Sequence, residues 1–235
     1  NILGYGGTFL RSARSPEFLD KKNRVIAHKQ LRKYNINALI VIGGNGSLTG
    51  ASVFSHEFNI PVIGIPASID NDVFGTDYSI GYNTALETIV ESVDKIRDTA
   101  NSHNRLFFIE VMGRKSGNLA LNASLASGAC FVILPEKKFE LIDLVKRLED
   151  NKKRNKESSI VIVAEGNNYG PSYKIAEDLS KVYSAYESKV TILGHIQRGG
   201  KPTSYDRILA SQLGMAAIES LKLKKALRER WKKQF

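Results

Sequence analysis

The sequence contains few of the residues that mark secreted, membrane or zinc proteins. Its 235 residues include a single cysteine, Cys130, so no disulfide framework can form within the chain. No stretch approaches the roughly 18 consecutive apolar residues of a membrane-spanning helix, and no signal peptide is visible. The four histidines show no metal-ligand spacing, which argues against a zinc site. We therefore expect a cytoplasmic protein that binds no membrane.

Two common catalytic motifs are missing as well. The glycine run Gly43–Ser47 lacks the Gly-Lys-Ser ending of a Walker P-loop. No Gly-x-Ser-x-Gly elbow is present, and Cys130 lies in an apolar run, so nucleophilic catalysis of the hydrolase type lacks its parts.

The net charge of +10 is concentrated at the end of the chain. Residues 222–235 contain seven lysines and arginines against one acidic residue, Glu229. The remaining body is only modestly basic, which suits an enzyme of phosphorylated substrates as well as a nucleic-acid binder. Apolar residues recur at helical spacing in this basic amphipathic tail, and we expect it to pack on the body or a partner. A membrane-surface or nucleic-acid patch is the alternative, and we expect no nucleic-acid partner.

Short apolar, β-branched runs alternate with amphipathic patterns along the chain. This alternation predicts an α/β fold with mostly parallel sheets and helices on both faces. We expect strands at residues 38–42, 62–65, 106–111, 130–134, 160–164 and 190–193. We expect helices at residues 23–34, up to about 58, 80–102, 117–126, 139–148, 173–183 and 205–221. The charged residues 149–157 are expected to form a solvated connection.

Unusual polar residues follow several of these predicted strands. Asp70, Asp72 and Asp77 lie in the loop of residues 66–77, directly after a buried strand. Ligands of parallel sheets bind outside the carboxyl ends of the strands, so these carboxylates are candidates for chemistry. The alternative is an Asx-rich turn that only connects two elements.

Glycines and arginines recur at the same kind of position. Gly43–Ser47 lies between a strand and a helix, where backbone N–H groups and the helix N-terminus can hold a phosphate; the alternative is a simple tight turn. Arg114 and Arg198 follow strands beside glycines, and arginine suits bidentate phosphate recognition. Carboxylates, arginines and a glycine turn together fit magnesium-assisted phosphoryl transfer.

In order along the chain, these segments closely resemble the 6-phosphofructokinases, which phosphorylate fructose 6-phosphate at its 1-hydroxyl. The resemblance covers roughly residues 3–221. Its motifs are Gly6-Gly7-Thr8, Gly43-Gly44-Asn45-Gly46-Ser47, Ser68-Ile69-Asp70-Asn71-Asp72, Gly75-Thr76-Asp77, Met112-Gly113-Arg114, Glu165, Leu193-Gly194-His195-Ile196-Gln197-Arg198-Gly199-Gly200 and Asp206-Arg207-Ile208-Leu209-Ala210.

The resemblance implies roles for the residues of the sugar site. Asp70 would be the general base, and Asp72 would belong to the same catalytic loop. Arg114 would help stabilise charge on the transferred phosphoryl group and contact the sugar. Arg105 and Lys189 would reach the 6-phosphate from a neighbouring subunit, which implies a homotetramer with active sites shared between subunits. The other sugar-phosphate contacts would be Ser68, Ile69, Met112, Gly113, Glu165, His195, Ile196, Gln197 and Arg198.

Two small residues indicate which phosphoryl donor the chain uses. Pyrophosphate-using relatives typically carry Asp at the place of Gly46 and Lys at the place of Ala67, so the resemblance favours ATP as co-substrate. ATP would be held by Arg14, Ser15, Gly44, Asn45, Gly46 and Ser47. Asn45 stands where the family usually has a magnesium-binding Asp, so Mg²⁺ should be held less tightly.

Three further positions depart from the family. Lys189 stands where Arg is common and lacks its bidentate fork. Cys130 replaces a Glu of the effector nucleotide site, which argues against regulation by ADP or phosphoenolpyruvate. Ser68 stands where Thr is usual. The basic positions of the effector site are still matched by Arg97, Arg154 and Lys156.

We predict a two-lobed phosphofructokinase-like architecture. Residues 1–80 would form the nucleotide-binding lobe and residues 81–221 the sugar-phosphate lobe, with elements shared between the lobes, and residues 222–235 would form the basic tail. We expect the chain to lack the first strand and the closing elements of the family. A non-catalytic sugar-phosphate-binding or regulatory subunit, or an inactive fragment, is the alternative function, and a pyrophosphate-dependent enzyme is a further one.

Overall fold

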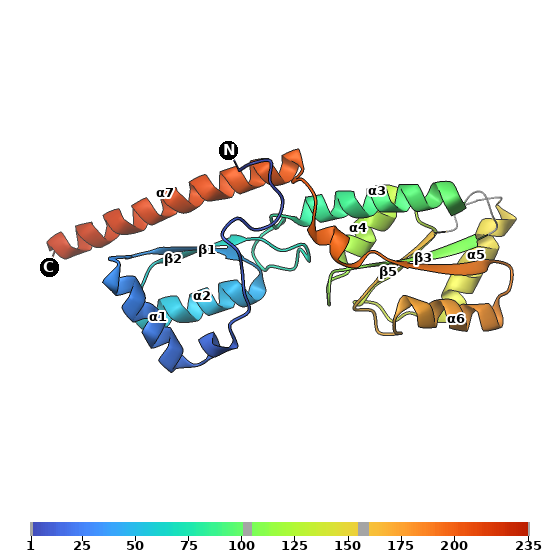
Figure 1. Cartoon of the computed structure of the whole chain (residues 1–235), viewed down its shortest axis with the longest axis horizontal. Coiled ribbons are helices and arrows are strands. Elements are labelled where there is room, and N and C mark those ends of the chain that lie inside the picture. The colour runs from blue at the N-terminus through green and yellow to red at the C-terminus, as the bar shows by residue number, and fades with distance from the viewer. Residues whose placement is uncertain (1, 101–104, 155–159, 235) are drawn as a thin grey trace. The chain divides into compact units, whose positions relative to one another are not determined.

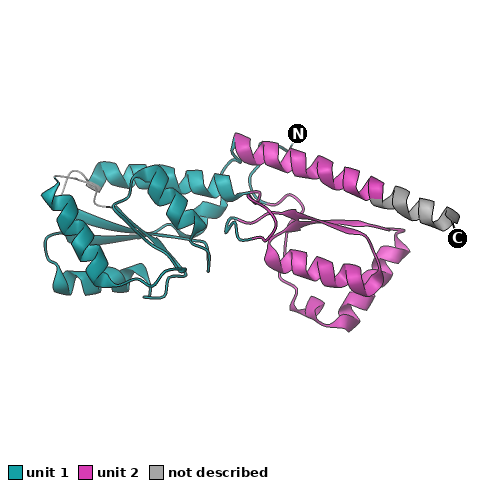
Figure 2. Cartoon of the chain, turned by 180° about the vertical axis from the view of Figure 1, so that it is seen from behind, with its two compact units in different colours: residues 1–7, 69–72, 81–203 teal, residues 8–68, 73–80, 204–235 magenta. Residues whose placement is uncertain are grey.

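The computed structural model describes residues 2–100, 105–154 and 160–234, with the backbone alone at residues 100 and 224–234 (Figure 1). It divides into two compact units, each assembled from separate segments (Figure 2). Unit 1 comprises residues 1–7, 69–72 and 81–203, and unit 2 comprises residues 8–68, 73–80 and 204–235. None of the described helices is long and apolar enough to cross a membrane.

Unit 1 is built on a four-stranded parallel sheet with the strand order β4-β5-β3-β6. Its strands are β3 (Arg105–Val111), β4 (Phe131–Ile133), β5 (Ile160–Ala164) and β6 (Glu187–Ile192). Its helices are α3 (Tyr82–Ala100), α4 (Asn118–Ser127), α5 (Leu141–Lys153), α6 (Ser172–Val182) and the 3₁₀ helix η2 (Gly194–Arg198).

Both faces of this sheet are covered, and side-chain alternation in the strands assigns residues to each face. Phe107 and Ile109 of β3 pack in one core with residues of α3 and α4. Leu106 and Phe108 pack in a second core with residues of α5 and α6. A strand buried on both faces is apolar at nearly every position, which explains the uninterrupted apolar runs in the sequence.

One expected connection is partly helical. Residues 149–153, predicted to be a solvated link, continue α5 to Lys153. Leu148 and Asn151 are buried on the inner face of this helix, while its charged residues lie on the outer face. The prediction that the helix ends before residue 149 was therefore wrong, although the charged residues of this part are exposed as expected. Residues 155–157 lie outside the described residues.

Unit 2 contains a parallel pair of strands, β1 (Leu39–Gly43) and β2 (Val62–Pro66). Helix α2 (Asn45–Phe58) contacts both strands, and α7 (Ser204–Gln234) lies over β2 from the other side (Figure 1). The remaining elements are the 3₁₀ helix η1 (Pro16–Leu19) and α1 (Lys21–Lys33). Residues 222–234 continue α7 as one helix.

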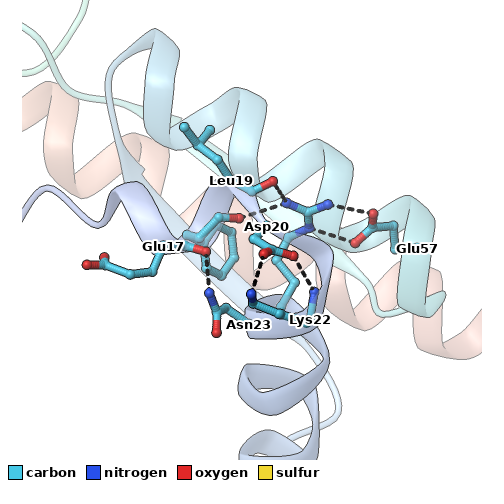
Figure 3. A network of polar contacts seen from close by, with 8 residues as sticks. Glu17, Leu19, Asp20, Lys22, Asn23 and Glu57 are labelled. Carbon is cyan, nitrogen blue, oxygen red and sulfur yellow. Dashed lines mark hydrogen bonds and ion pairs between the residues drawn. The ribbon is translucent and has the colours of Figure 1, made fainter.

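A partly buried ion pair joins helices of unit 2. The Arg24 guanidinium donates to both carboxylate oxygens of Glu57, at 2.7 and 2.8 Å (Figure 3). It also donates to the carbonyls of Phe18 and Leu19, both at 2.7 Å. Because Glu57 belongs to α2 and the carbonyls to η1, this arginine of α1 fastens η1 and α1 onto α2.

The prediction of an α/β fold with parallel sheets is confirmed.

Candidate active site

The site in unit 1 lies at the carboxyl ends of β3 and β5. The helix that follows β3 packs on one face of the sheet, and the helix that follows β5 packs on the other. Two neighbouring parallel strands whose connections leave to opposite faces open a crevice at their carboxyl ends, where α/β proteins bind ligands. Arg114 follows β3 and Glu165 follows β5, so both predicted residues lie at this crevice.

The backbones of these two loops touch. The Arg114 backbone N–H donates to the Glu165 carboxylate at 2.9 Å. A Cβ at Gly166 would lie 1.6 Å from the Arg114 carbonyl oxygen, so only glycine permits this approach. Arg114 itself has φ +53°, a backbone conformation that few non-glycine residues adopt and that is enriched at functional sites. The turn that presents Arg114 therefore depends on Gly166.

The short segment Ile69–Asp72 belongs to unit 1, although the residues on either side of it belong to unit 2. The Ser116 hydroxyl donates to the Asp70 carbonyl at 2.8 Å. The Asn118 side-chain amide donates to the Asn71 carbonyl at 2.9 Å, and Asn71 has φ +49°. These hydrogen bonds fix the segment beside the start of α4 and so position the Asp70 side chain.

Asp70 is the best candidate for a proton acceptor in the site. Its side chain is 14% exposed and lies 3.8 Å from Nε of Arg114, which is 62% exposed. Burial raises the pKa of Asp70; the nearby charges of Asp72 and Glu165 act in the same direction, while Arg114 and Arg198 oppose it. A carboxylate whose proton affinity is raised while a cation lies beside it suits general base catalysis near neutral pH.

Helix η2 contributes both internal and exposed residues to this region. Gln197 is buried; its amide oxygen accepts from the Met112 backbone N–H at 3.0 Å and its amide NH₂ donates to the Gly194 carbonyl at 2.9 Å. Gln197 thus links η2 to the segment that leads into Arg114. The predicted residues His195, Ile196 and Arg198 are exposed on the same helix.

Arg105 and Lys189 are not brought to this site. Arg105 is the first residue of β3, whereas Arg114 follows its last residue, and a strand of this length spans about 20 Å. Lys189 lies on the neighbouring strand β6, opposite Phe107. Both cations pair instead with Glu187, a residue that the sequence analysis did not single out.

The predicted nucleotide-side residues lie in unit 2. Gly44 is the N-cap of α2, and no side chain caps this helix end. Nothing lies within 4 Å of a Cβ built on Gly46, whereas one on Gly44 would lie 3.5 Å from the Cβ of Ser68. Asn45, Ser47, Arg14 and Ser15 are exposed. The start of α2 therefore offers backbone N–H groups and short polar side chains to an anion.

No group of three or more His, Cys, Asp or Glu side chains with metal-binding geometry occurs among the described residues. Mg²⁺ in phosphoryl-transfer enzymes is held largely by substrate phosphates and water, with one or two protein oxygens. The exposed amide oxygen of Asn45 at the start of α2 fits that limited role, as a neutral donor.

The described residues that match an effector site lie at different kinds of position. Cys130 is buried, and burial raises the pKa of its thiol to about 11. Arg97 donates to the Ser127 carbonyl at the end of α4. Arg154 is the C-cap of α5, and Lys156 lies outside the described residues.

Sequence reasoning missed Gly166, Ser116, Asn118 and Glu187. The motif Glu165-Gly166 carried a signal for the first, since a glycine directly after a strand often permits close backbone approach. The other three act through side-chain contacts between segments 46 to 82 residues apart. No local pattern reveals such contacts.

The family model described as phosphofructokinase matches residues 1–221 of the chain. The chain is 52% identical over 221 residues to ATP-dependent 6-phosphofructokinase 2 of Bacteroides thetaiotaomicron, covering 94% of the chain and 68% of that protein. It is 49% identical over 221 residues to ATP-dependent 6-phosphofructokinase of Listeria welshimeri, with the same coverage.

Solved structures of similar architecture include a yeast phosphofructokinase. The crystal structure of Pichia pastoris phosphofructokinase in the T-state has a TM-score of 0.86 and 36% identity, covering 93% of this chain and 26% of that one. A pyrophosphate-dependent phosphofructokinase from Marinobacter aquaeolei shares the fold at 22% identity, with a TM-score of 0.78. The chain spans about two thirds of the curated relatives and about a quarter of the Pichia chain.

Proposed function

Because the chain belongs to the phosphofructokinase family, we propose that it transfers a phosphoryl group from ATP to the 1-hydroxyl of fructose 6-phosphate, a reaction of glycolysis. The product is fructose 1,6-bisphosphate. The observation that carries this proposal is the position of Asp70, largely buried and 3.8 Å from Nε of Arg114, where the loops after β3 and β5 meet.

In this mechanism Asp70 accepts the proton of the sugar 1-hydroxyl as its oxygen attacks phosphorus. The Arg114 guanidinium, exposed next to that carboxylate, stabilises charge on the transferred phosphoryl group. Asp72, in the same loop, contributes to the negative field that keeps the proton affinity of Asp70 high. The side chains of Ser116 and Asn118 donate to the backbone carbonyls of Asp70 and Asn71 and so hold the base in place during the transfer.

The sugar phosphate is held by residues around the same crevice. Glu165 accepts hydrogen bonds from sugar hydroxyls while it also fixes the Arg114 backbone. Gln197 positions Met112 and Gly113 from inside the fold. The proposed direct contacts are Ser68, Ile69, Met112, Gly113, Glu165, His195, Ile196 and Arg198.

ATP is the proposed donor, held by Arg14, Ser15 and the residues from Gly44 to Ser47. The uncapped N-terminus of α2 supplies N–H donors and a partial positive charge for the phosphates. Open space lies beside Gly46, and both Gly46 and Ala67 stand where pyrophosphate-using relatives carry charged side chains. Mg²⁺, when bound, would neutralise phosphate charge in the transfer, with Asn45 as its ligand from this chain.

We propose a homotetramer in which Arg105 and Lys189 bind the 6-phosphate of a sugar held by a partner subunit. The separation of about 20 Å along β3 supports this assignment, because Arg105 cannot contact a small substrate beside Arg114 of its own chain. Each subunit would then contribute to two active sites.

The test is a coupled assay with fructose 6-phosphate and either ATP or pyrophosphate, together with calorimetric binding of fructose 6-phosphate. Turnover with ATP is the expected result. Turnover with pyrophosphate alone would overturn the choice of donor. Binding of the sugar phosphate without turnover from either donor would favour a non-catalytic sugar-phosphate-binding subunit.

A further inference from the structure

Three charged side chains form a compact triad at the amino-terminal ends of β3 and β6. Nε of Arg105 lies 2.8 Å from one carboxylate oxygen of Glu187, and Nζ of Lys189 lies 2.5 Å from the other. In the register of the two strands, Arg105 is directly opposite Glu187. Because side chains alternate along a strand, Glu187 and Lys189 project from the same face as Arg105.

The Glu187 carboxylate forms an ion pair with Arg105 and with Lys189 at the same time. Each Glu187 oxygen is used by a different cation, and all three side chains remain partly exposed to solvent. Hydrogen bonds from Lys189 and Arg105 lower the pKa of Glu187 to about 2, so it is ionised throughout the neutral range. The triad therefore carries one net positive charge rather than two.

A phosphate monoester can bind Arg105 and Lys189 through anionic oxygens, as the Glu187 carboxylate does. It presents anionic oxygens spaced for one guanidinium and one ammonium, at a charge close to −2 at neutral pH. An arriving phosphate would have to displace the Glu187 oxygens or share their donors with them. It would also meet the like charge of the carboxylate at short range.

We propose that Glu187 sets the affinity of the Arg105–Lys189 pair for a phosphate monoester by competing with that phosphate for both cations. This inference rests on the proposed function, in which the pair receives the 6-phosphate of a sugar held by a partner subunit. Glu187 acts through its two neighbours and is a specificity-determining residue of the phosphate subsite.

The experiment compares wild type with Glu187→Gln, which keeps the shape of the side chain and removes its charge. Glu177→Gln is the matched control, because Glu177 is an exposed glutamate paired with a lysine, Lys181, on α6. Glu187→Asp tests whether a charge at this position suffices. Binding of fructose 6-phosphate and of inorganic phosphate is measured by calorimetry, and KM and kcat are measured in the coupled assay.

We expect Glu187→Gln to bind fructose 6-phosphate about two- to fivefold more tightly, the range of an exposed ion pair, with kcat changed less than about twofold. Glu177→Gln and Glu187→Asp should stay near wild type. An affinity that is unchanged or weaker in Glu187→Gln than in Glu177→Gln would overturn the inference, because Glu187 would then only align the cations.

Failure of the proposed function would be seen in the wild-type protein and not in the comparison of variants. A wild type that neither binds fructose 6-phosphate nor turns it over would contradict that function before any variant is compared. The inorganic phosphate measurement would still decide the inference in that case. Tighter phosphate binding by Glu187→Gln supports competition, and unchanged binding refutes it.

Discussion

The two units present different chemical surfaces to the substrates proposed for them. In unit 1 the candidate groups are charged side chains, and hydrogen bonds between distant segments fix their backbones. In unit 2 the candidate groups are the backbone of a helix N-terminus and short exposed side chains. A proton acceptor needs one defined position and a tuned charge, whereas a polyphosphate can be held by many N–H donors. Substitutions in unit 1 should therefore alter the chemical step, and substitutions in unit 2 should alter the choice of donor.

The largest effect is expected from Asp70→Asn in unit 1. The amide keeps the size of the side chain but cannot accept the proton, so kcat should fall about 10³-fold with KM for fructose 6-phosphate little changed. Asp94→Asn, at an exposed position of α3, is the control for loss of one negative charge. A kcat within tenfold of wild type would refute Asp70 as the base.

The second-largest effect is expected from Gly46→Asp in unit 2. Open space at Gly46 accommodates the side chain, so the fold should persist while the new carboxylate repels the nucleotide phosphates. We expect kcat/KM for ATP to fall about 10²-fold, with KM for fructose 6-phosphate unchanged. Gly46→Asn separates charge from bulk; an equal loss in both variants would contradict electrostatic exclusion of ATP.

Two glycines provide a comparison of stability between the units. Gly166→Ala in unit 1 should lower the free energy of unfolding by about 3 kcal/mol and reduce kcat, because its Cβ would collide with the Arg114 carbonyl. Gly214→Ala in α7 of unit 2 meets no atom within 4 Å and should stabilise the protein by about 0.5–1 kcal/mol. Denaturant unfolding measures both changes. Equal effects would mean that the Gly166 contact does not constrain the loop.

The smallest effect concerns the acid limb of the pH–rate profile. Burial raises the pKa of Asp70, so activity should be lost on acidification at a higher pH than for an ordinary aspartate. Arg114 lowers this pKa, so Arg114→Gln should move the acid limb to still higher pH. Arg198, a weaker influence in the same direction, should give a smaller displacement when replaced by Gln. A limb that moves to lower pH in either variant would contradict this electrostatic account.

The strands and helices could be predicted because their signals are local. The apolar run Leu106–Ile109 and the helical stripe of α3 carry their own periodicity, and both elements form as expected. The segment Ile69–Asp72 could not be assigned to unit 1, because its place depends on hydrogen bonds from Ser116 and Asn118. For the same reason the sequence could not indicate which separate segments each unit is assembled from.

The candidate site was predicted at the level of residue types and strand ends. Asp70, Arg114 and Glu165 come together as the strand-end reasoning expected. Gln197 was grouped with the substrate contacts, yet its side chain is directed inward to Met112 and Gly194, a geometry that only a folded chain reveals. The roles of all these residues remain predictions until the variants are measured.

The alternation of side chains along β3 has a consequence for insertions and deletions. Adding one residue within this strand would exchange its two sets of core residues, turning Phe107 and Ile109 toward the helices that now cover Leu106 and Phe108. Adding two would keep the faces but lengthen the strand by about 6–7 Å. We expect natural variation in this strand to occur by substitution at constant length, with its two ends held at a fixed spacing.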